Sequence, residues 1–164
     1  MEPIGIASLA IGGGLFAVLT FVHFFVDWIF QSHSEAMVKH NHPWIRAKHC
    51  AIYTTGFLPF FYVCGFTPLE WIFSINLLFW SHFVEDTYLP VYYWAKYIRR
   101  PPQMTEPQKT TGLDGYVTVG QPDPKKGFVQ FVETPIGKIL MIAVDQIIHL
   151  AFLFPIAWLA IGHL

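Results

Sequence analysis

The sequence is short of charge and of cysteine. Charged residues make up 13% of the 164 residues, against roughly 25% in a typical soluble domain. The net charge is −1, so nothing indicates a surface for nucleic acid. Cys50 and Cys64 are the only cysteines. On one helix they would lie roughly 20 Å apart, too far for a disulfide, so we expect them to be packing residues.

Several functional motifs are also missing. The chain has no P-loop, no Rossmann glycine pattern and no serine-nucleophile motif. No basic stretch precedes the first apolar run, as it would in a cleavable signal peptide. We therefore expect the first apolar run to be retained.

Apolar residues are abundant and fall in long runs. The chain is 54% hydrophobic and 18% aromatic. Four runs are each long enough for the roughly 17–25 residues that a membrane crossing needs: about 4–30, 50–66, 69–97 and 136–161. The predicted fold class is an all-α membrane protein, with four transmembrane helices in a single domain covering residues 1–164.

The basic residues predict an orientation. All ten Lys and Arg residues lie between the first and second runs, or between the third and fourth runs and at the facing ends of those two. They are Lys39, Arg46, Lys48, Lys96, Arg99, Arg100, Lys109, Lys125, Lys126 and Lys138. Because cytoplasmic loops retain Lys and Arg, we expect a prokaryotic inner (plasma) membrane protein with both termini outside.

Two connections carry local signals. Thr67-Pro68-Leu69-Glu70 has the pattern of a capping box with proline at the first helical position, which predicts a tight turn before a helix. The polar loop 98–134 contains two strand-like runs, Tyr116–Val119 and Phe128–Val132, so we expect a cytoplasmic β-hairpin there. Such a hairpin can cover a site or serve as a connector.

Ionisable residues recur inside the apolar runs at a spacing of four. This spacing puts two side chains on one helix face, and buried charges in a membrane normally face the bundle interior. At similar depths in the cytoplasmic half we expect one cluster of metal ligands: His23, Asp27, His49, His82, Asp86, Asp145 and His149.

Imidazole and carboxylate groups are ligands for zinc, iron and manganese. We therefore predict one or two divalent ions. If two ions bind, we expect one aspartate to bridge them. Gln31 and Gln146 are candidate catalytic residues that would hydrogen-bond the ligands or a substrate. The alternative is a polar core of His–Asp hydrogen bonds that stabilises the bundle or relays protons.

These motifs also carry a resemblance. Their segments, 23–31, 48–53, 82–86 and 145–150, resemble in order a family of small prokaryotic and phage integral-membrane proteins catalogued as domain of unknown function 3307. The long loop 98–134 and Leu89-Pro90 depart from that pattern. The resemblance implies a polytopic membrane protein and no established reaction.

Three functions remain open from the sequence. The first is a divalent-metal-dependent hydrolase of a phosphoester-type substrate, with a site opening to the cytoplasm. The second is a metal or proton transporter. The third is a non-catalytic membrane subunit whose polar core is structural. The expected partners are the lipid bilayer and other membrane subunits, with no nucleic acid.

Overall fold

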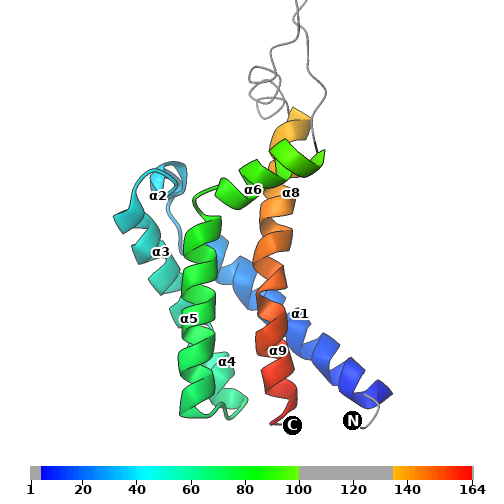
Figure 1. Cartoon of the computed structure of the whole chain (residues 1–164). Coiled ribbons are helices and arrows are strands. Elements are labelled where there is room, and N and C mark those ends of the chain that lie inside the picture. The colour runs from blue at the N-terminus through cyan, green and yellow to red at the C-terminus, as the bar shows by residue number, and fades with distance from the viewer. Residues whose placement is uncertain (1–4, 100–134, 164) are drawn as a thin grey trace, which may run out of the picture. The chain divides into compact units, whose positions relative to one another are not determined.

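The computed structural model describes residues 5–99 and 135–163. These residues are helical and contain no strand (Figure 1). The expected β-hairpin falls within 100–134 and lies outside the described residues. The chain divides into two compact units, residues 1–89 with 146–164, and residues 90–145.

The second unit contains short helical segments in its described part. Helix α6 (Leu89–Trp94) is followed directly by a π-helical turn at Ala95–Arg99. Helix α8 (Pro135–Ala151) begins in this unit and ends in the other. The ammonium of Lys96 lies over the rings of Tyr92 and Tyr97.

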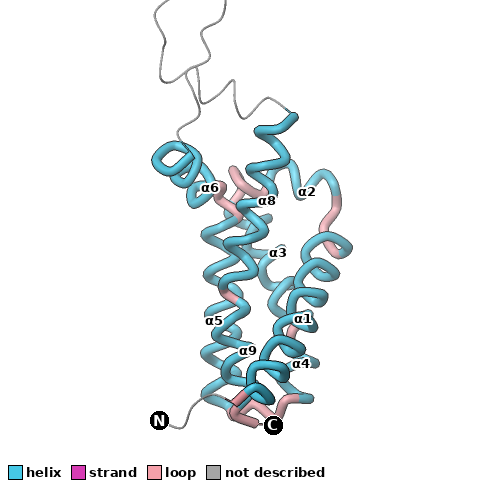
Figure 2. The backbone as a smooth tube through the Cα atoms, turned by 90° about the vertical axis from the view of Figure 1, so that its right-hand side faces the viewer, coloured by secondary structure: helices cyan, strands magenta, loops and turns pink. Residues whose placement is uncertain are grey.

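The first unit is a bundle of helices that pack lengthwise. It contains α1 (Ile6–Ile29), α2 (His33–Val38), α3 (Pro43–Gly56), α4 (Leu58–Val63), α5 (Pro68–Glu85), the end of α8, and α9 (Leu153–Ile161). Helix α1 packs along α9, and α3 packs along α5 and against α1. The start of α1, the turn after α4 and the end of α9 lie at one end of this bundle, and α2 lies at the other (Figures 1 and 2).

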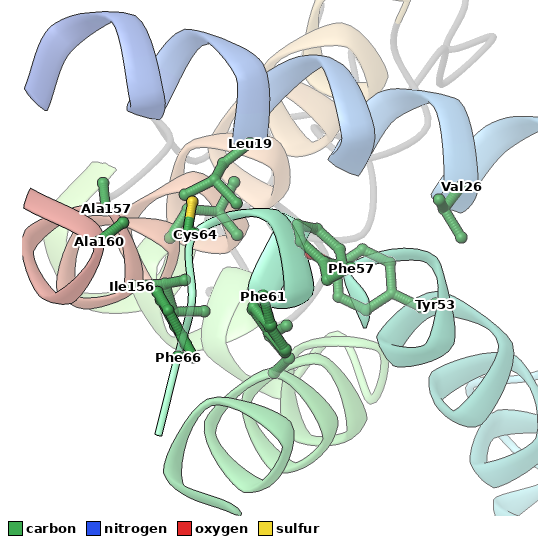
Figure 3. Close-up of a cluster of buried hydrophobic side chains, with 12 residues drawn as sticks. Leu19, Val26, Tyr53, Phe57, Phe61, Cys64, Phe66, Ile156, Ala157 and Ala160 are labelled. Carbon is green, nitrogen blue, oxygen red and sulfur yellow. The ribbon is translucent and has the colours of Figure 1, made fainter. Parts of the chain in front are cut away.

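The apolar core of the first unit lies between α1, α3, α4, α5 and α9 (Figure 3). Leu19, Phe57, Phe61 and Ile156 are each 0% exposed. The stacked rings of Phe61 and Phe66, with centroids 5.2 Å apart, close one end of this core. Helices α1, α3 and α5 also carry buried polar side chains, so this packing positions those side chains.

The second expected run is two helices rather than one. Helix α3 begins at Pro43, ends at Gly56, and is followed by α4. Pro59 has no N–H to donate to the carbonyl of Thr55, and its ring crowds that carbonyl. The N–H of Phe57, at the end of α3, donates to the carbonyls of Thr54 and Thr55. The expected span 50–66 is therefore shifted and broken.

The third expected run is also interrupted. Helix α5 ends at Glu85, where 69–97 was expected to be continuous. Tyr88 has a φ of 60°, the left-handed conformation that bulky residues rarely adopt. Pro90 follows in the first turn of α6 and cannot donate to the carbonyl of Asp86. The break therefore has a local cause.

Other local predictions are confirmed. The Thr67 side chain and the Glu70 carboxylate form a reciprocal capping box, with Thr67 N donating to Glu70 Oε2 at 2.8 Å. Gly65, with a φ of 70°, makes the turn before it. Cys50 and Cys64 are both free and buried.

Two of the helical segments are long and apolar enough to cross a membrane, judged by length and composition. They are Ile6–Ile29 and Pro135–Ile161. Among the described residues, the other two expected spans do not meet this test. Large apolar side chains are exposed on both qualifying segments, including Ile6, Phe21 and Phe154.

Candidate metal centre

Buried His, Asp and Glu side chains gather in the first unit, at the end nearer α2. They come from α1 (His23, Asp27), α3 (His49), the end of α5 (His82, Glu85, Asp86) and the end of α8 (His149). Each is 5% exposed or less. The spacing of four on α1 and on α5 gives each helix one polar face. Apart from Asp145, the predicted ligands therefore lie in one unit.

Asp27, His49 and His82 form the tightest group. His49 Nε2 lies 2.9 Å from Asp27 Oδ1. His82 Nε2 lies 2.9 Å from His49 Nε2 and 3.4 Å from Asp27 Oδ1. Three side chains from three helices thus direct one atom each at a common point.

Protons alone satisfy this group poorly. If both imidazoles donate to Asp27, two N–H groups crowd each other across 2.9 Å. If only one imidazole donates, the Nε2 lone pair of the other imidazole points at the Asp27 carboxylate, which has no proton to give it. The three distances define a circle of about 1.8 Å radius, so an ion about 1 Å from their plane reaches each atom at the roughly 2.0–2.2 Å of zinc bonds. The group can hold one divalent ion.

Asp86 lies beside the group and is held by a buried lysine. Lys39 Nζ lies 2.8 Å from Asp86 Oδ1, with side-chain exposures of 10% and 5%. Asp86 Oδ2 lies 3.5 Å from His82 Nε2 and 3.7 Å from His49 Nε2. Among the residues that the structure describes, this oxygen accepts no hydrogen bond. Lys39 therefore orients Asp86 with one oxygen toward the imidazoles.

The segment that carries Lys39 is tied to α3. Lys48 Nζ contacts Glu35 Oε1 at 2.7 Å, and this hydrogen bond lowers the pKa of the Glu35 carboxyl below its ordinary value. The Arg46 guanidinium donates to the carbonyls of Lys39 and His40, at 3.3 and 3.0 Å. These contacts fix the turn after α2, and with it the Lys39 side chain.

His23 has a different environment from the other predicted ligands. Its Nδ1 lies 2.9 Å from the Tyr53 hydroxyl and its Nε2 lies 3.0 Å from Gln146 Oε1. Both ring nitrogens are therefore engaged in hydrogen bonds. The Tyr53 ring stacks on the His82 imidazole with centroids 3.9 Å apart. In this arrangement His23 and Tyr53 position His82.

His149 pairs with a carboxylate that was not among the expected ligands. Its Nε2 lies 3.1 Å from Glu85 Oε2, and both side chains are buried. His82, Asp86 and His149 also form a second group of candidate ligands, with ligand atoms within 4.8 Å of one another. The groups share His82, whereas the sequence analysis expected a shared aspartate.

The other predicted residues fall in different places. Asp145 belongs to neither ligand group and lies in the second unit. Gln146 contacts His23, as above. Gln31 lies just after α1, and its Nε2 is buried with no hydrogen-bond partner among the described residues. Their catalytic and metal-binding roles stay predictions.

Three side chains of the cluster escaped the sequence analysis. Lys39 was counted only among the basic residues, and Glu85 and Tyr53 were not among the expected ligands. A helical projection of α3 gives a partial signal for Tyr53, because it lies four residues after His49. No comparable signal exists for Lys39, whose position depends on the turn after α2.

The cluster carries excess negative charge. It contains three carboxylates, on Asp27, Glu85 and Asp86, and one ammonium, on Lys39. With neutral imidazoles the sum is two negative charges. Because unbalanced charge is costly in a buried site, one divalent cation or two added protons is needed to neutralise it.

Comparison with known proteins finds no matching family model, no similar curated protein and no similar solved structure. The resemblance of the motifs to domain of unknown function 3307 stays a prediction. The chemistry of the site is therefore argued from its geometry.

Proposed function

We propose that this chain is a polytopic membrane protein that binds one divalent metal ion and uses it to hydrolyse a phosphoester. Four helical segments would cross the bilayer: α1, the broken pair α3–α4, α5, and α8–α9. The two long apolar segments and their exposed side chains support this. The charge distribution supports both termini lying outside, because Lys39, Arg46 and Lys48 gather near the α2 end.

The orientation has a direct test. Ser34 in α2 and His163 after α9 are both exposed, whereas native Cys50 and Cys64 are buried. In intact cells, a membrane-impermeant maleimide should label His163→Cys and should label Ser34→Cys only after permeabilisation. The unsubstituted chain is the control. Labelling of both variants from one face would contradict the topology.

One observation carries the metal proposal: atoms from Asp27, His49 and His82 converge within 2.9–3.4 Å of one another. Two imidazoles and a carboxylate suit zinc, iron or manganese. The ion's charge would neutralise the cluster without further protons. Three protein ligands also leave a coordination position open, as catalytic zinc sites do.

The surroundings of that position favour hydrolysis. A divalent ion makes a bound water more acidic, and Asp86 Oδ2 lies near both imidazole nitrogens with capacity to accept a proton. The contact with Lys39 keeps Asp86 directed inward. Lys48 is exposed near this end and would attract the phosphate of a substrate at the inner leaflet.

The test uses the full chain in detergent or nanodiscs. Metal content is measured by mass spectrometry, and hydrolysis is followed with bis(p-nitrophenyl) phosphate before and after chelation. We expect one bound equivalent and metal-dependent turnover, both lost in His49→Ala. His33→Ala, a matched change at an exposed histidine of α2, should retain both. Metal without turnover on a panel of phosphoesters would contradict hydrolysis, and no metal in the unsubstituted chain would contradict the centre itself.

A further inference from the structure

The two groups of candidate ligands overlap in a single residue. Asp27, His49 and His82 form one, and His82, Asp86 and His149 form the other. Every member is buried, and the two groups are drawn from four helices of the first unit. The overlap raises the question of whether two ions bind together or one ion has two positions.

The shared residue argues for one ion at a time. In a neutral imidazole one ring nitrogen carries a proton, and the other offers one lone pair. His82 Nε2 is the atom that faces Asp27, His49 and Asp86. A lone pair directed at one ion is not available to a second ion.

The charge of the cluster leads to the same conclusion. Three carboxylates and the Lys39 ammonium leave two negative charges, which one divalent cation neutralises wherever it sits in the cluster. A second divalent cation would leave two uncompensated positive charges in a buried site, which is costly. Two ions at once therefore need anions beyond the three carboxylates that the described residues place in the cluster.

The second group has an additional carboxylate at its edge. Glu85 Oε2 lies 3.1 Å from His149 Nε2, within the spacing of ligands around one small ion. Asp86 Oδ2, which accepts no hydrogen bond among the described residues, lies 3.5 Å from His82 Nε2. His82, Asp86, His149 and Glu85 thus supply two imidazoles and two carboxylates.

We propose that one divalent cation alternates between two positions: a first at Asp27, His49 and His82, and a second at His82, Asp86 and His149 with Glu85 as an added ligand. This rests on the metal binding proposed above. His82 stays coordinated in both positions, so the ion moves without leaving the cluster. The shorter distances in the first group make it the main position.

Co²⁺ is the probe, because its visible absorption reports the ligands around it. The full chain, Asp27→Asn, Glu85→Gln and the double variant are titrated with Co²⁺, and stoichiometry, affinity and spectrum are measured. Glu70→Gln, at the glutamate of the capping box and outside the cluster, is the matched control. Size-exclusion profiles and circular dichroism check folding, and His49→Gln removes the first position independently if Asp27→Asn does not fold.

The unsubstituted chain should bind one equivalent. Asp27→Asn should also bind one, more weakly and with a changed spectrum. Glu85→Gln should keep the original spectrum and affinity, yet added to Asp27→Asn it should weaken binding by roughly another 10- to 100-fold, the usual range for disturbing a metal site. Alternation therefore predicts that Glu85→Gln weakens Co²⁺ binding only when Asp27 is also substituted.

Other results overturn the inference in distinguishable ways. Two equivalents in the unsubstituted chain would show simultaneous sites. Complete loss of Co²⁺ from folded Asp27→Asn and folded His49→Gln would remove the second position and leave the metal centre standing. No binding by the unsubstituted chain would remove the proposed centre as well.

Discussion

Replacing Gly56 by alanine tests whether the close approach of α1 and α3 sets the site. A Cβ built on Gly56 overlaps Val26 Cγ2 and lies 3.0 Å from Val26 Cγ1 and 3.2 Å from its Cβ. Val26 is 5% exposed, and its branched side chain has little rotamer freedom in a helix. The clash therefore has to move the helices rather than a flexible side-chain end.

The expected magnitude is the difference of two effects. Overpacking of a well-packed site lowers stability by about 1–3 kcal/mol. Replacing a helical glycine by alanine raises stability by about 1 kcal/mol through helix propensity. We expect Gly56→Ala to lower the free energy of unfolding by up to about 2 kcal/mol. Val26 directly precedes the proposed ligand Asp27 on α1, so a shift of Val26 should also displace Asp27. We therefore expect Gly56→Ala to lower metal affinity as well as stability.

Thermal unfolding in detergent and Co²⁺ titration measure the two effects. Gly14→Ala is the matched control: its Cβ meets nothing within 4 Å, so it should be neutral or stabilising. Val26→Ala removes the methyl groups that clash, and in the double variant the penalty of Gly56→Ala should disappear. The reasoning fails if Gly56→Ala and Gly14→Ala change stability equally, or if Val26→Ala gives no rescue.

Three further substitutions test contacts of the cluster. Lys39→Met should destabilise the metal-free protein by about 3–5 kcal/mol in chemical unfolding, because it leaves buried Asp86 without its cation. Adding Asp86→Asn should restore most of the lost stability, and no restoration would refute the pairing. Tyr53→Phe should cost about 1 kcal/mol by removing the donor to His23, with metal stoichiometry unchanged; loss of the ion would make Tyr53 essential to binding. Thr67→Ala should cost about 1 kcal/mol through the lost cap and leave Co²⁺ affinity unaltered, and an altered affinity would show that the cap acts on the site.

Helix ends were predictable where the signal is local. The capping box at Thr67 and Glu70 depends on side chains three residues apart, so the sequence contains everything that forms it. The interruptions at Pro59 and Pro90 were harder to predict. Proline weakens a helix at a known position, but a membrane helix can continue through it if neighbouring groups satisfy the freed carbonyl. That compensation depends on contacts that the sequence does not specify.

The polar faces were predictable for a similar reason. A spacing of four puts His23 with Asp27 and His82 with Asp86 on one face of each helix, whatever packs against it. Glu85 could not be assigned, because adjacent helical residues point about 100° apart and its partner, His149, comes from a distant helix. Lys39 reaches Asp86 only because the turn after α2 is held beside α3.

The sequence by itself determined which residue types are present, which of them share a helix face and where several helices begin. Tertiary structure decided which atoms meet. It brought Asp27, His49 and His82 within hydrogen-bonding range of each other, engaged both ring nitrogens of His23 elsewhere, and added Glu85 and Lys39 to the cluster. The physical reason is that helix periodicity fixes the direction of a side chain, whereas distances between helices depend on packing such as that of Gly56 on Val26.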